Sequence, residues 1–445
     1  MNSNPKSTSQ SYLFRRRGAS IAALCFGSLL AFGNCAEAED ENYLWLTSPG
    51  GDSGAPGTLS GDTETVPFTV DVTDVNGETD FLFETTQTID LYINIVDPVA
   101  PVSGSRVRVF ELIDNSTGRS TLFQAASDAN GNVSGSFTVN RTTPIVVLEY
   151  EFAGQTYSQQ VDITYVQEIR RTLNVFATVG PVVIADQDGD GIPDDEDAYP
   201  DDPDRATTVS YPADGGYYTV AYEDLYPRQG DADFNDYVLR ASYEADLNAS
   251  GELVRLRGDY THVARGAGYR HTLHLSLDGV ADAQFQLKRY ASDGTLESES
   301  DSTIADFQGV MILPASNTTI SNSNTRRGGS ALSAGKRAVF EIIPGTPVNL
   351  TDLGAMPFDL FLKVINTNRE IHFLGRYFEA DGEDRYLDSA GFPWALLVPG
   401  NWRWPYERQD VRPAYPDFES WYASGGAFGV NWYENANDEL VVPPL

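Results

Sequence analysis

Two regions of the chain alternate hydrophobic and polar residues with the period of a β-strand. In "IDLYINIVD" every second residue from Ile89 to Ile95 is aliphatic, and "SRVRVFELI", "NVSGSFTV" and "IVVLEYEF" follow with similar patterns. Turn-forming stretches such as "SDANGN" separate these segments. Several short strands at this spacing predict a small sandwich of the immunoglobulin-like kind over residues 85–180.

The alternation returns near residue 207 and continues to about residue 440. "YVLRASYEA", "YRHTLHLSL" and "PFDLFLKVI" each place apolar side chains on one face. Helical periodicity is scarce, although "YPDFESWYASGG" is compatible with one short helix, and residues 315–330 have the composition of an exposed loop. We therefore predict an all-β chain, in which an Asp-rich linker over 184–206 connects the first sandwich to a larger, jelly-roll-like β-sandwich over 207–440.

Residues 1–38 have the features of a secretion signal. Arg15 to Arg17 form a basic region, a short apolar stretch follows, and "AEA" at residues 36–38 supplies a cleavage pattern of small residues. The alternatives are an uncleaved membrane anchor and a lipoprotein acylated at Cys35, although Asn34 before it is not small. Residues 39–84 are rich in Gly, Ser and Asp and are interpreted as a spacer. No later segment reaches membrane-spanning length.

Cysteine content and charge narrow the environment and the partners. Cys25 and Cys35 both lie in or beside the signal, so the mature domains hold no disulfide and need core burial, hydrogen bonds or bound metal for stability. The net charge of −34 becomes −37 when residues 1–38, with four basic residues and one acidic residue, are removed. This charge makes nucleic acid and anionic membranes poor partners and divalent cations good ones. A generally acidic surface adapted to salty surroundings would explain most of these acids equally well.

The stretch "DQDGDGIPDDED", residues 186–197, has the ligand spacing of an EF-hand-like calcium loop. Gly191 at position 6 permits a sharp turn, and Ile192 at position 7 would contribute its backbone carbonyl. The acids at positions 1, 3, 5, 9 and 12 are Asp186, Asp188, Asp190, Asp194 and Asp197.

Calcium takes six to eight hard oxygens, which alternate residues of a tight loop can direct inward. The stretch resembles a thrombospondin type 3 repeat and is expected to form a rigid, calcium-braced connector between domains. By analogy with extracellular calcium-binding modules, its dissociation constant would be roughly 10⁻⁴–10⁻³ M. A solvated acidic linker is the alternative.

A second acidic stretch, "EDLYPRQGDADFNDYVL", begins at residue 223. In an extended chain the two-residue spacing would direct Asp231, Asp233 and Asn235 to one side. The predicted calcium ligands are Glu223, Asp224, Asp231, Asp233, Asn235 and Asp236. The alternatives are an acidic turn held by hydrogen bonds without metal, and a catalytic carboxylate pair. The acids precede their strand, whereas catalytic acids of α/β sheets follow one.

The same stretch resembles the signature of the LruC-type domain family of bacterial exported and outer-membrane proteins. The matching segments are "EDLYP" and "GDADFND", and later "REIHFLG", "GFPWALLVP", "AYPDFESWYASGG" and "NWY". The resemblance spans about residues 207–440. It implies export, a β-rich module that often follows an immunoglobulin-like domain, and no known enzymatic activity. Some relatives are lipoproteins, which keeps acylation of Cys35 open.

The remaining candidates are histidines and aromatic residues. His271 and His274 would face opposite sides of one strand, so His271 is expected to be packed and hydrogen-bonded, and a shared zinc site is not expected. The C-terminal aromatic residues would either pack in a core or form a platform for sugar rings. They are Trp394, Trp402, Trp404, Trp421, Tyr422, Trp432 and Tyr433.

These features favour an exported, non-enzymatic, calcium-binding protein that serves in adhesion, surface architecture or ligand display. Its location would be the periplasm, the outer-membrane surface or the extracellular space. Besides calcium, the expected partner is a glycan or another surface protein. The alternative functions are a carbohydrate-binding module and a secreted hydrolase that uses the GDADFND carboxylates.

Overall fold

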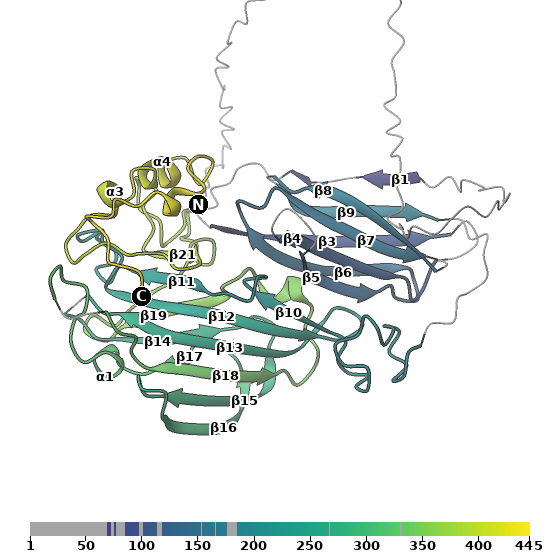
Figure 1. Cartoon of the computed structure of the whole chain (residues 1–445), viewed down its shortest axis with the longest axis horizontal. Helices are drawn as coiled ribbons and strands as arrows, with labels where there is room; N and C mark the ends of the chain where they lie inside the picture. Colours follow the sequence, from purple (N-terminus) through teal and green to yellow (C-terminus); the bar gives the residue numbers. More distant parts are fainter. Residues whose placement is uncertain are drawn as a thin grey trace, which may run out of the picture. The chain divides into compact units, whose positions relative to one another are not determined.

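The computed structural model describes residues 69–72, 75–76, 85–97, 101–113, 118–152, 154–164, 166–175, 185–266, 268–329 and 332–445. The predicted signal peptide, residues 39–68 of the predicted spacer, and both cysteines lie outside these residues. The structure is nearly all β, as predicted, with only short helices (Figure 1). Within the described part of the chain, none of the helices has the length and apolar character needed to cross a membrane.

The first sandwich consists of two sheets built from nine strands. These are β1 (Thr69–Val72), β2 (Val75–Asn76), β3 (Thr86–Val96), β4 (Arg106–Ile113), β5 (Gly118–Ala126), β6 (Asn132–Asn140), β7 (Ile145–Phe152), β8 (Gln155–Asp162) and β9 (Val166–Asn174). One sheet has the order β1-β9-β3-β6, with β2 also paired to β9, and the other has the order β5-β4-β7-β8. Strand β3 buries every second residue, as its alternation predicts. Strands β1 and β2 fall inside the predicted spacer, so strand structure begins before residue 85.

The second sandwich is larger. Its strands are β10 (Thr207–Tyr211), β11 (Tyr218–Tyr222), β12 (Tyr237–Leu247), β13 (Leu253–Ala264), β14 (His271–Ser276), β15 (Ala281–Tyr290), β16 (Leu296–Asp306), β17 (Val310–Leu313), β18 (Arg337–Ile343), β19 (Asp359–Val364), β20 (Arg369–Ile371) and β21 (Ala395–Pro399). The eight-stranded sheet has the order β16-β15-β18-β13-β12-β11-β21, with β10 paired to β12, and the four-stranded sheet has the order β17-β14-β19-β20.

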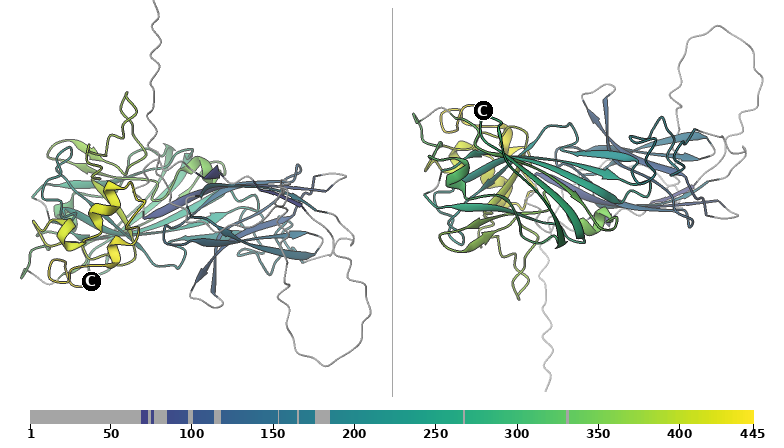
Figure 2. Two further views of the ribbon diagram at one scale, coloured as in Figure 1. Left: turned by 90° about the horizontal axis from the view of Figure 1, so that it is seen from above. Right: turned by 90° about the horizontal axis from the view of Figure 1, so that it is seen from below.

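The ribbons of these two sheets can be followed in Figure 2, and buried tyrosines form hydrogen bonds between the sheets. The Tyr222 hydroxyl on β11 donates a hydrogen bond to the Leu360 carbonyl on β19 at 2.9 Å. The Tyr243 hydroxyl on β12 donates to the Pro357 carbonyl at 3.1 Å. The large aromatic side chains therefore fill the space between the sheets while their polar ends remain hydrogen-bonded.

The helices are α1 (Ser316–Thr319), α2 (Leu350–Leu353), α3 (Val411–Ala414), α4 (Phe418–Ala423) and the 3-10 helix η2 (Trp432–Glu434). Helix α4 lies in the stretch expected to hold a short helix. A hydrophobic cluster separate from the inter-sheet core, here called the C-terminal aromatic core, surrounds α3, α4 and η2. Its aromatic members are Phe234, Phe392, Trp402, Trp404, Tyr415, Phe418, Trp421, Tyr422 and Trp432.

Of residues 315–330, predicted as an exposed loop, residues 317–318, 321–322 and 326–329 are exposed, but part of the stretch is buried. Ser316 and Thr319 are buried. The Ser316 hydroxyl accepts a hydrogen bond from the His271 backbone N–H at 3.1 Å, and the Thr319 hydroxyl lies 2.6 Å from Nδ1 of His262. Polar side chains can be buried when partners satisfy them, and these partners come from distant strands that the local sequence does not reveal.

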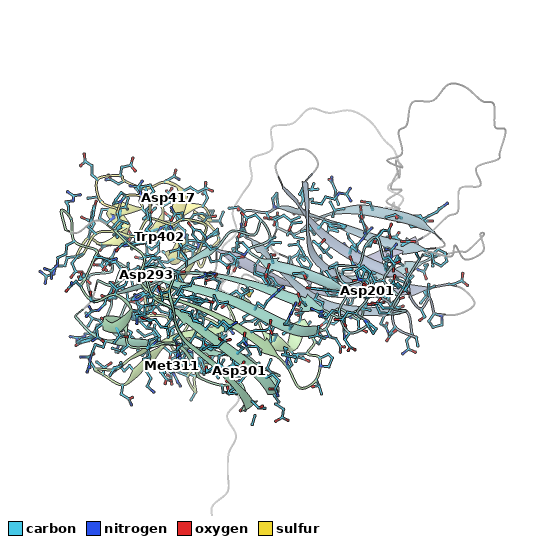
Figure 3. The ribbon with its side chains drawn as sticks, turned by 60° about the horizontal axis from the view of Figure 1, so that its bottom comes forward. Asp201, Asp293, Asp301, Met311, Trp402 and Asp417 are labelled. Atoms are coloured by element: carbon cyan, nitrogen blue, oxygen red, sulfur yellow. The ribbon has the colours of Figure 1, made fainter. Side chains whose placement is uncertain are left out.

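Much of the acidic charge lies on the open surface. Asp201, Asp293 and Asp301 are exposed, whereas Trp402 is buried (Figure 3). Strand β16 is exposed along almost its whole length and carries several acids, which protects this edge of the sheet from pairing with another chain. These surface acids need no bound cation, so the two acidic clusters must be judged on their own geometry.

Candidate cation-binding sites

The loop of residues 186–197 is held by its own aspartates. Asp188 Oδ1 accepts a hydrogen bond from the Asp190 N–H at 3.2 Å, and Asp190 Oδ1 accepts one from the Ile192 N–H at 2.7 Å. Aspartate favours such short-range turns because its side chain reaches the backbone two residues on. Gly191 has a φ of 100°, which residues with a Cβ rarely adopt. The turn predicted at position 6 is therefore present.

Carboxylate oxygens gather inside this loop. Asp186, Asp188 and Asp190 each offer an oxygen, and these three oxygens lie within 4.8 Å of one another. Asp188, Asp190 and Asp197 each use Oδ1 to accept a backbone hydrogen bond, while each Oδ2 is buried without a hydrogen-bond partner. Burial, followed by the charges of the other aspartates, raises the pKa of Asp197 to about 6. The free oxygens are the kind of ligand that a hard cation takes.

Two predicted ligands of this loop behave differently. Asp194 Oδ1 accepts a hydrogen bond from the Gln187 N–H at 2.7 Å, which closes the loop. Asp194 does not belong to the group of three aspartates whose oxygens lie together. The Ile192 side chain is buried, and ligation by its carbonyl stays a prediction.

The exit of the loop is attached to both sandwiches. Glu196 forms ion pairs with Arg106 and Arg108 of β4. The Tyr199 hydroxyl donates a hydrogen bond to Oδ1 of Asp246 on β12 at 3.0 Å. The conformation of the loop is thus linked to contacts with the strands on either side of it in the sequence.

The backbone of residues 230–236 is not extended, so the prediction from its two-residue spacing was wrong. Ala232 and Phe234 have φ values of 54° and 48°, in the left-handed region that residues with a Cβ seldom occupy. Both side chains are buried in the C-terminal aromatic core. Burial of these two residues in the core fixes a tight loop there, and such conformations persist only where the surroundings determine them.

Three of the six predicted ligands nevertheless come together in the second cluster. Glu223, Asp231 and Asp233 offer oxygens that lie within 4.8 Å of one another. Glu223 has no exposed surface; its Oε1 accepts a hydrogen bond from the Phe234 N–H at 2.5 Å, and its Oε2 has no partner. Asp233 Oδ2 accepts a hydrogen bond from the Arg408 N–H at 2.7 Å. The cluster therefore joins the start of the loop to a segment far along the chain.

Asn235 supplies a further free oxygen. Its amide Nδ2 donates to the Pro405 carbonyl at 3.1 Å, and its Oδ1 is buried without a partner. A Cβ on Gly266 would lie 1.7 Å from this oxygen, so only glycine allows the approach. Asn235 was predicted as a ligand, whereas Gly266 has no sequence signal that singles it out.

Asp224 and Asp236 make hydrogen bonds of their own, although the charge of Asp236 follows burial as a cause of the raised pKa of Glu223. Asp236 Oδ2 accepts a hydrogen bond from the Asp224 N–H at 2.8 Å, and Asp224 Oδ2 lies 2.9 Å from Nε2 of His271. These two acids are therefore not in the group of three, while His271 is packed and hydrogen-bonded as expected. His271 Nδ1 also lies 3.2 Å from the Ser316 hydroxyl, which gives a Ser–His–Asp series. All three side chains are at most 4% exposed, so substrate cannot reach the serine in this structure.

The second cluster differs from Asp246 in its ion pairs among the described residues. Asp246, which is equally buried, pairs with Arg255 and Arg257. Among the ion pairs of the described residues, none links an arginine or lysine side chain to Glu223, Asp231 or Asp233. Burial, followed by neighbouring carboxylates, raises the pKa of Asp233 to about 8 and that of Glu223 well above its usual range. A buried, uncompensated cluster of this kind binds either protons or a cation.

Glu407 is a neighbour that the sequence did not reveal. Its carboxylate contributes to the raised pKa of Asp233, after burial and Asp231. The pKa of Glu407 is itself raised by burial and then by Asp231. Glu407 lies more than 170 residues from the GDADFND stretch, next to Arg408, whose backbone binds Asp233. Only the fold brings the two segments together, because no spacing pattern connects them.

The raised pKa values predict how stability changes with pH in a chelator. For Asp197 and Asp233 the folded state holds protons that the unfolded state releases, so stability is highest below about pH 4 for these groups. It is lost as the pH rises through about 6 and about 8 respectively. The melting temperature in chelator is therefore expected to fall from pH 5 to pH 8. Asp233→Asn is expected to flatten this slope, and an unchanged slope would contradict the assignment.

The C-terminal aromatic residues do not form a surface platform. Trp402, Trp421 and Trp432 are at most 3% exposed, and of the seven predicted residues only Tyr433 is not fully buried. Their rings contact one another within the C-terminal aromatic core. The packing interpretation is therefore the one that the burial supports, and stacking of these rings on a sugar is not available in this conformation.

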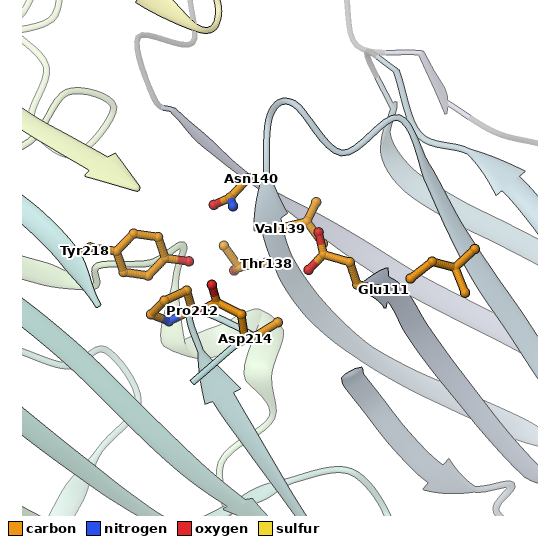
Figure 4. Close-up of a pocket in the computed structure, with 9 residues that line it drawn as sticks. Glu111, Thr138, Val139, Asn140, Pro212, Asp214 and Tyr218 are labelled. Carbon is orange, nitrogen blue, oxygen red and sulfur yellow. The ribbon is translucent and has the colours of Figure 1, made fainter. Parts of the chain in front are cut away.

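A pocket of about 210 Å³ lies at a different place (Figure 4). Its lining includes Glu111 of β4, Asn140 of β6, and Asp214 and Tyr218 from the β10–β11 region. Burial raises the pKa of Glu111, which accepts a hydrogen bond from the Thr143 hydroxyl at 2.5 Å. None of the twelve predicted site residues lines it.

Comparison with known proteins gives limited matches. A family model described as Domain of unknown function (DUF4842) matches residues 251–433. A crystal structure of a Bacteroides ovatus protein, provisionally described as a lipoprotein, is 17% identical, with a TM-score of 0.46, covering 76% of this chain and 99% of that chain. A 9R-lipoxygenase from Cyanothece PCC8801 is 10% identical, with a TM-score of 0.15, covering 42% of this chain and 41% of that chain. No curated protein matches. The family match begins in the turn before β13, so it includes neither acidic stretch.

Proposed function

We propose that this chain is an exported, non-enzymatic protein that binds calcium in the loop of residues 186–197 and has a structural role. The observation that carries the proposal is how the loop uses its carboxylates. Asp188, Asp190 and Asp197 each give one oxygen to a backbone N–H and keep the other buried and free. A dication with a preference for hard oxygens would satisfy these atoms and offset the repulsion between the aspartates.

The position of the loop supports a connecting role. Glu196 forms ion pairs with two arginines of β4 in the first sandwich, and Tyr199 donates a hydrogen bond to Asp246 of β12 in the second. Calcium in the loop would stabilise the conformation in which both contacts form. Such a brace suits a protein that displays two β-sandwiches for adhesion, surface architecture or ligand display. The thrombospondin type 3 resemblance agrees with this role.

Export is proposed from the N-terminal sequence, which lies outside the described residues. The basic, apolar and small-residue regions of residues 1–38 direct the mature chain to the periplasm, the outer-membrane surface or the extracellular space. Acylation at Cys35 would anchor it to a membrane. The LruC-type resemblance supports the same destination.

The alternative functions have less support. The carbohydrate hypothesis rested on exposed tryptophans, and these side chains are buried. The hydrolase hypothesis needs a reachable pair among the GDADFND carboxylates, and of these Asp233 is buried whereas Asp231 is exposed. A glycan or another surface protein remains the proposed partner of the displayed surface.

Asp190→Asn tests the loop. The amide oxygen can still accept the Ile192 hydrogen bond, but an NH₂ group replaces the free oxygen. At about 10 mM calcium, 100 times a dissociation constant of roughly 10⁻⁴ M, an occupied loop contributes about 2.7 kcal/mol. That corresponds to a rise of about 5–10 °C in melting temperature. The variant is expected to lose most of this rise in scanning calorimetry with chelator and with calcium.

Asp195→Asn is the matched control, because Asp195 lies in the same loop but is exposed and is not a predicted ligand. It is expected to keep the full calcium-dependent rise. Equal behaviour of the two variants, or a wild-type melting temperature that calcium leaves unchanged, would overturn the proposal.

A further inference from the structure

The cluster around Glu223 contains a buried, free oxygen and, within the part of the chain that the structure describes, makes no ion pair with a basic side chain. Glu223 Oε1 is bound to the Phe234 N–H, while Oε2 faces Gly230 at the start of the GDADFND loop: a Cβ on Gly230 would lie 3.2 Å from Oε2. Oε2 has no partner, and Glu223 has no exposed surface. An oxygen in this state is aimed into the acidic cluster rather than at solvent.

We propose that Glu223, Asp231 and Asp233 form a second calcium site that holds the C-terminal segment against the larger sandwich. This inference is independent of calcium binding by the loop of residues 186–197. The three carboxylates already lie close enough for one ion, and Asp231 is exposed, so an ion can enter from solvent. Calcium suits the set because all the donors are hard oxygens and solvent can complete its shell.

Glu223 and Asp246 are both buried carboxylates, but they differ in their positively charged partners. Both Asp246 and Glu223 have no exposed surface. Arg255 and Arg257 neutralise Asp246, whereas no arginine or lysine side chain of the described residues pairs with Glu223. A buried charge in a folded protein requires a counter-charge. Calcium would supply Glu223 and its neighbours with the positive charge that Arg255 and Arg257 supply to Asp246.

The site would connect three separate segments. The Glu223 backbone N–H donates to the Trp394 carbonyl at 3.0 Å, just before β21. Asp233 binds the Arg408 N–H, and the Asn235 amide donates to the Pro405 carbonyl. These bonds lead into the C-terminal aromatic core, in which Phe234 itself is buried. Calcium bound at the Glu223 cluster is therefore expected to hold the segment that follows β21 against the start of β12.

Glu223→Gln is the variant that tests the site. The amide oxygen can keep the hydrogen bond from Phe234, and an NH₂ group replaces the free Oε2. Calcium would be titrated calorimetrically into the full chain, the Glu223→Gln variant, the Asp190→Asn variant and the double variant. Two sites are expected in the wild type, one in each single variant and none in the double variant. Glu419→Gln, at an exposed carboxylate of α4, is the control and keeps both sites.

Terbium luminescence identifies which site is filled. The described tryptophans all lie in residues 394–432, whereas Tyr199 is the aromatic residue at the exit of the first loop. Terbium excited through tryptophan is expected to emit in the Asp190→Asn variant and to lose most of this emission in Glu223→Gln. Hydrogen exchange is expected to show calcium-dependent protection of residues 394–423 in the wild type and in Asp190→Asn, but not in Glu223→Gln.

The outcomes separate the two calcium sites. If the wild type itself binds calcium only at the Glu223 cluster, tryptophan-sensitised emission stays intact and only the proposed function is contradicted. If Glu223→Gln binds as much calcium as the wild type, the second site is wrong. If the wild type shows no calcium-dependent protection near residue 408 and its stability follows pH alone, the cluster is a protonated turn and the inference is overturned. The check that the Glu223→Gln variant folds is its melting temperature in chelator, which should be no lower than that of the wild type.

Discussion

Asp246→Ala is expected to destabilise the chain by about 3 kcal/mol, the lower end of the range for breaking a buried ion pair. The carboxylate accepts hydrogen bonds from the hydroxyls of Tyr199 and Thr208, and it pairs with Arg255 and Arg257. After its removal Arg255 keeps only a pair with Glu341 at 3.6 Å and Arg257 only a pair with Glu244 at 3.3 Å, so both guanidinium groups lose their buried counter-charge. They keep 21% and 33% exposure, so water recovers part of the loss. Chemical denaturation followed by intrinsic fluorescence measures the change.

Asp259→Asn is the control for Asp246→Ala. Asp259 also pairs with an arginine, Arg337, but both side chains are well exposed. Exposed pairs contribute about 0–1 kcal/mol, so this variant is expected to change stability little. In chelator, Glu223→Gln is expected to leave the free energy of unfolding unchanged or to raise it, whereas Asp246→Ala lowers it. Equal losses for Asp246→Ala and Asp259→Asn would show that Asp246 is not the centre of a cooperative network.

The parts of the fold that the sequence predicted are those set by local patterns. The alternation in "IDLYINIVD" gives the buried face of β3 because side chains of a strand alternate between its two faces. The Asp186–Asp197 loop was predictable for the same reason, since its turns are closed by side chains that reach only two or three residues along the chain.

The second acidic stretch was predictable only in part. Its residue types indicated a cation site, and three of its acids do come together. Its backbone could not be predicted, because Phe234 adopts a left-handed conformation to enter a core made by residues more than 150 positions away. Likewise Asp224 was expected to be a ligand, but His271, from β14, takes its carboxylate. Burial and long-range partners decide these roles, and neither is written in local spacing.

Trp432→Ala is expected to destabilise the larger sandwich by about 3–5 kcal/mol, as large-to-small substitutions of buried aromatic residues do. Trp432 has no exposed surface, and its ring centre lies 4.8 Å from that of Phe418 and 5.4 Å from that of Trp421. Removing it leaves a cavity that the surrounding rigid rings of Trp402 and Tyr415 cannot fill. Tryptophan fluorescence during thermal unfolding measures this change.

Phe428→Ala is the matched control, because Phe428 lies in the same segment but is 71% exposed. Its free energy of unfolding is expected to stay within about 0.5 kcal/mol of the wild type.

A second calcium site would make the effect of calcium on stability depend on whether the C-terminal aromatic core is intact. If calcium fastens the segment after β21, then calcium should raise the melting temperature of Trp432→Ala less than that of Phe428→Ala, since the ion can stabilise only a segment whose core still holds it in place. Equal calcium effects in both variants would mean that the aromatic core and the Glu223 cluster act separately.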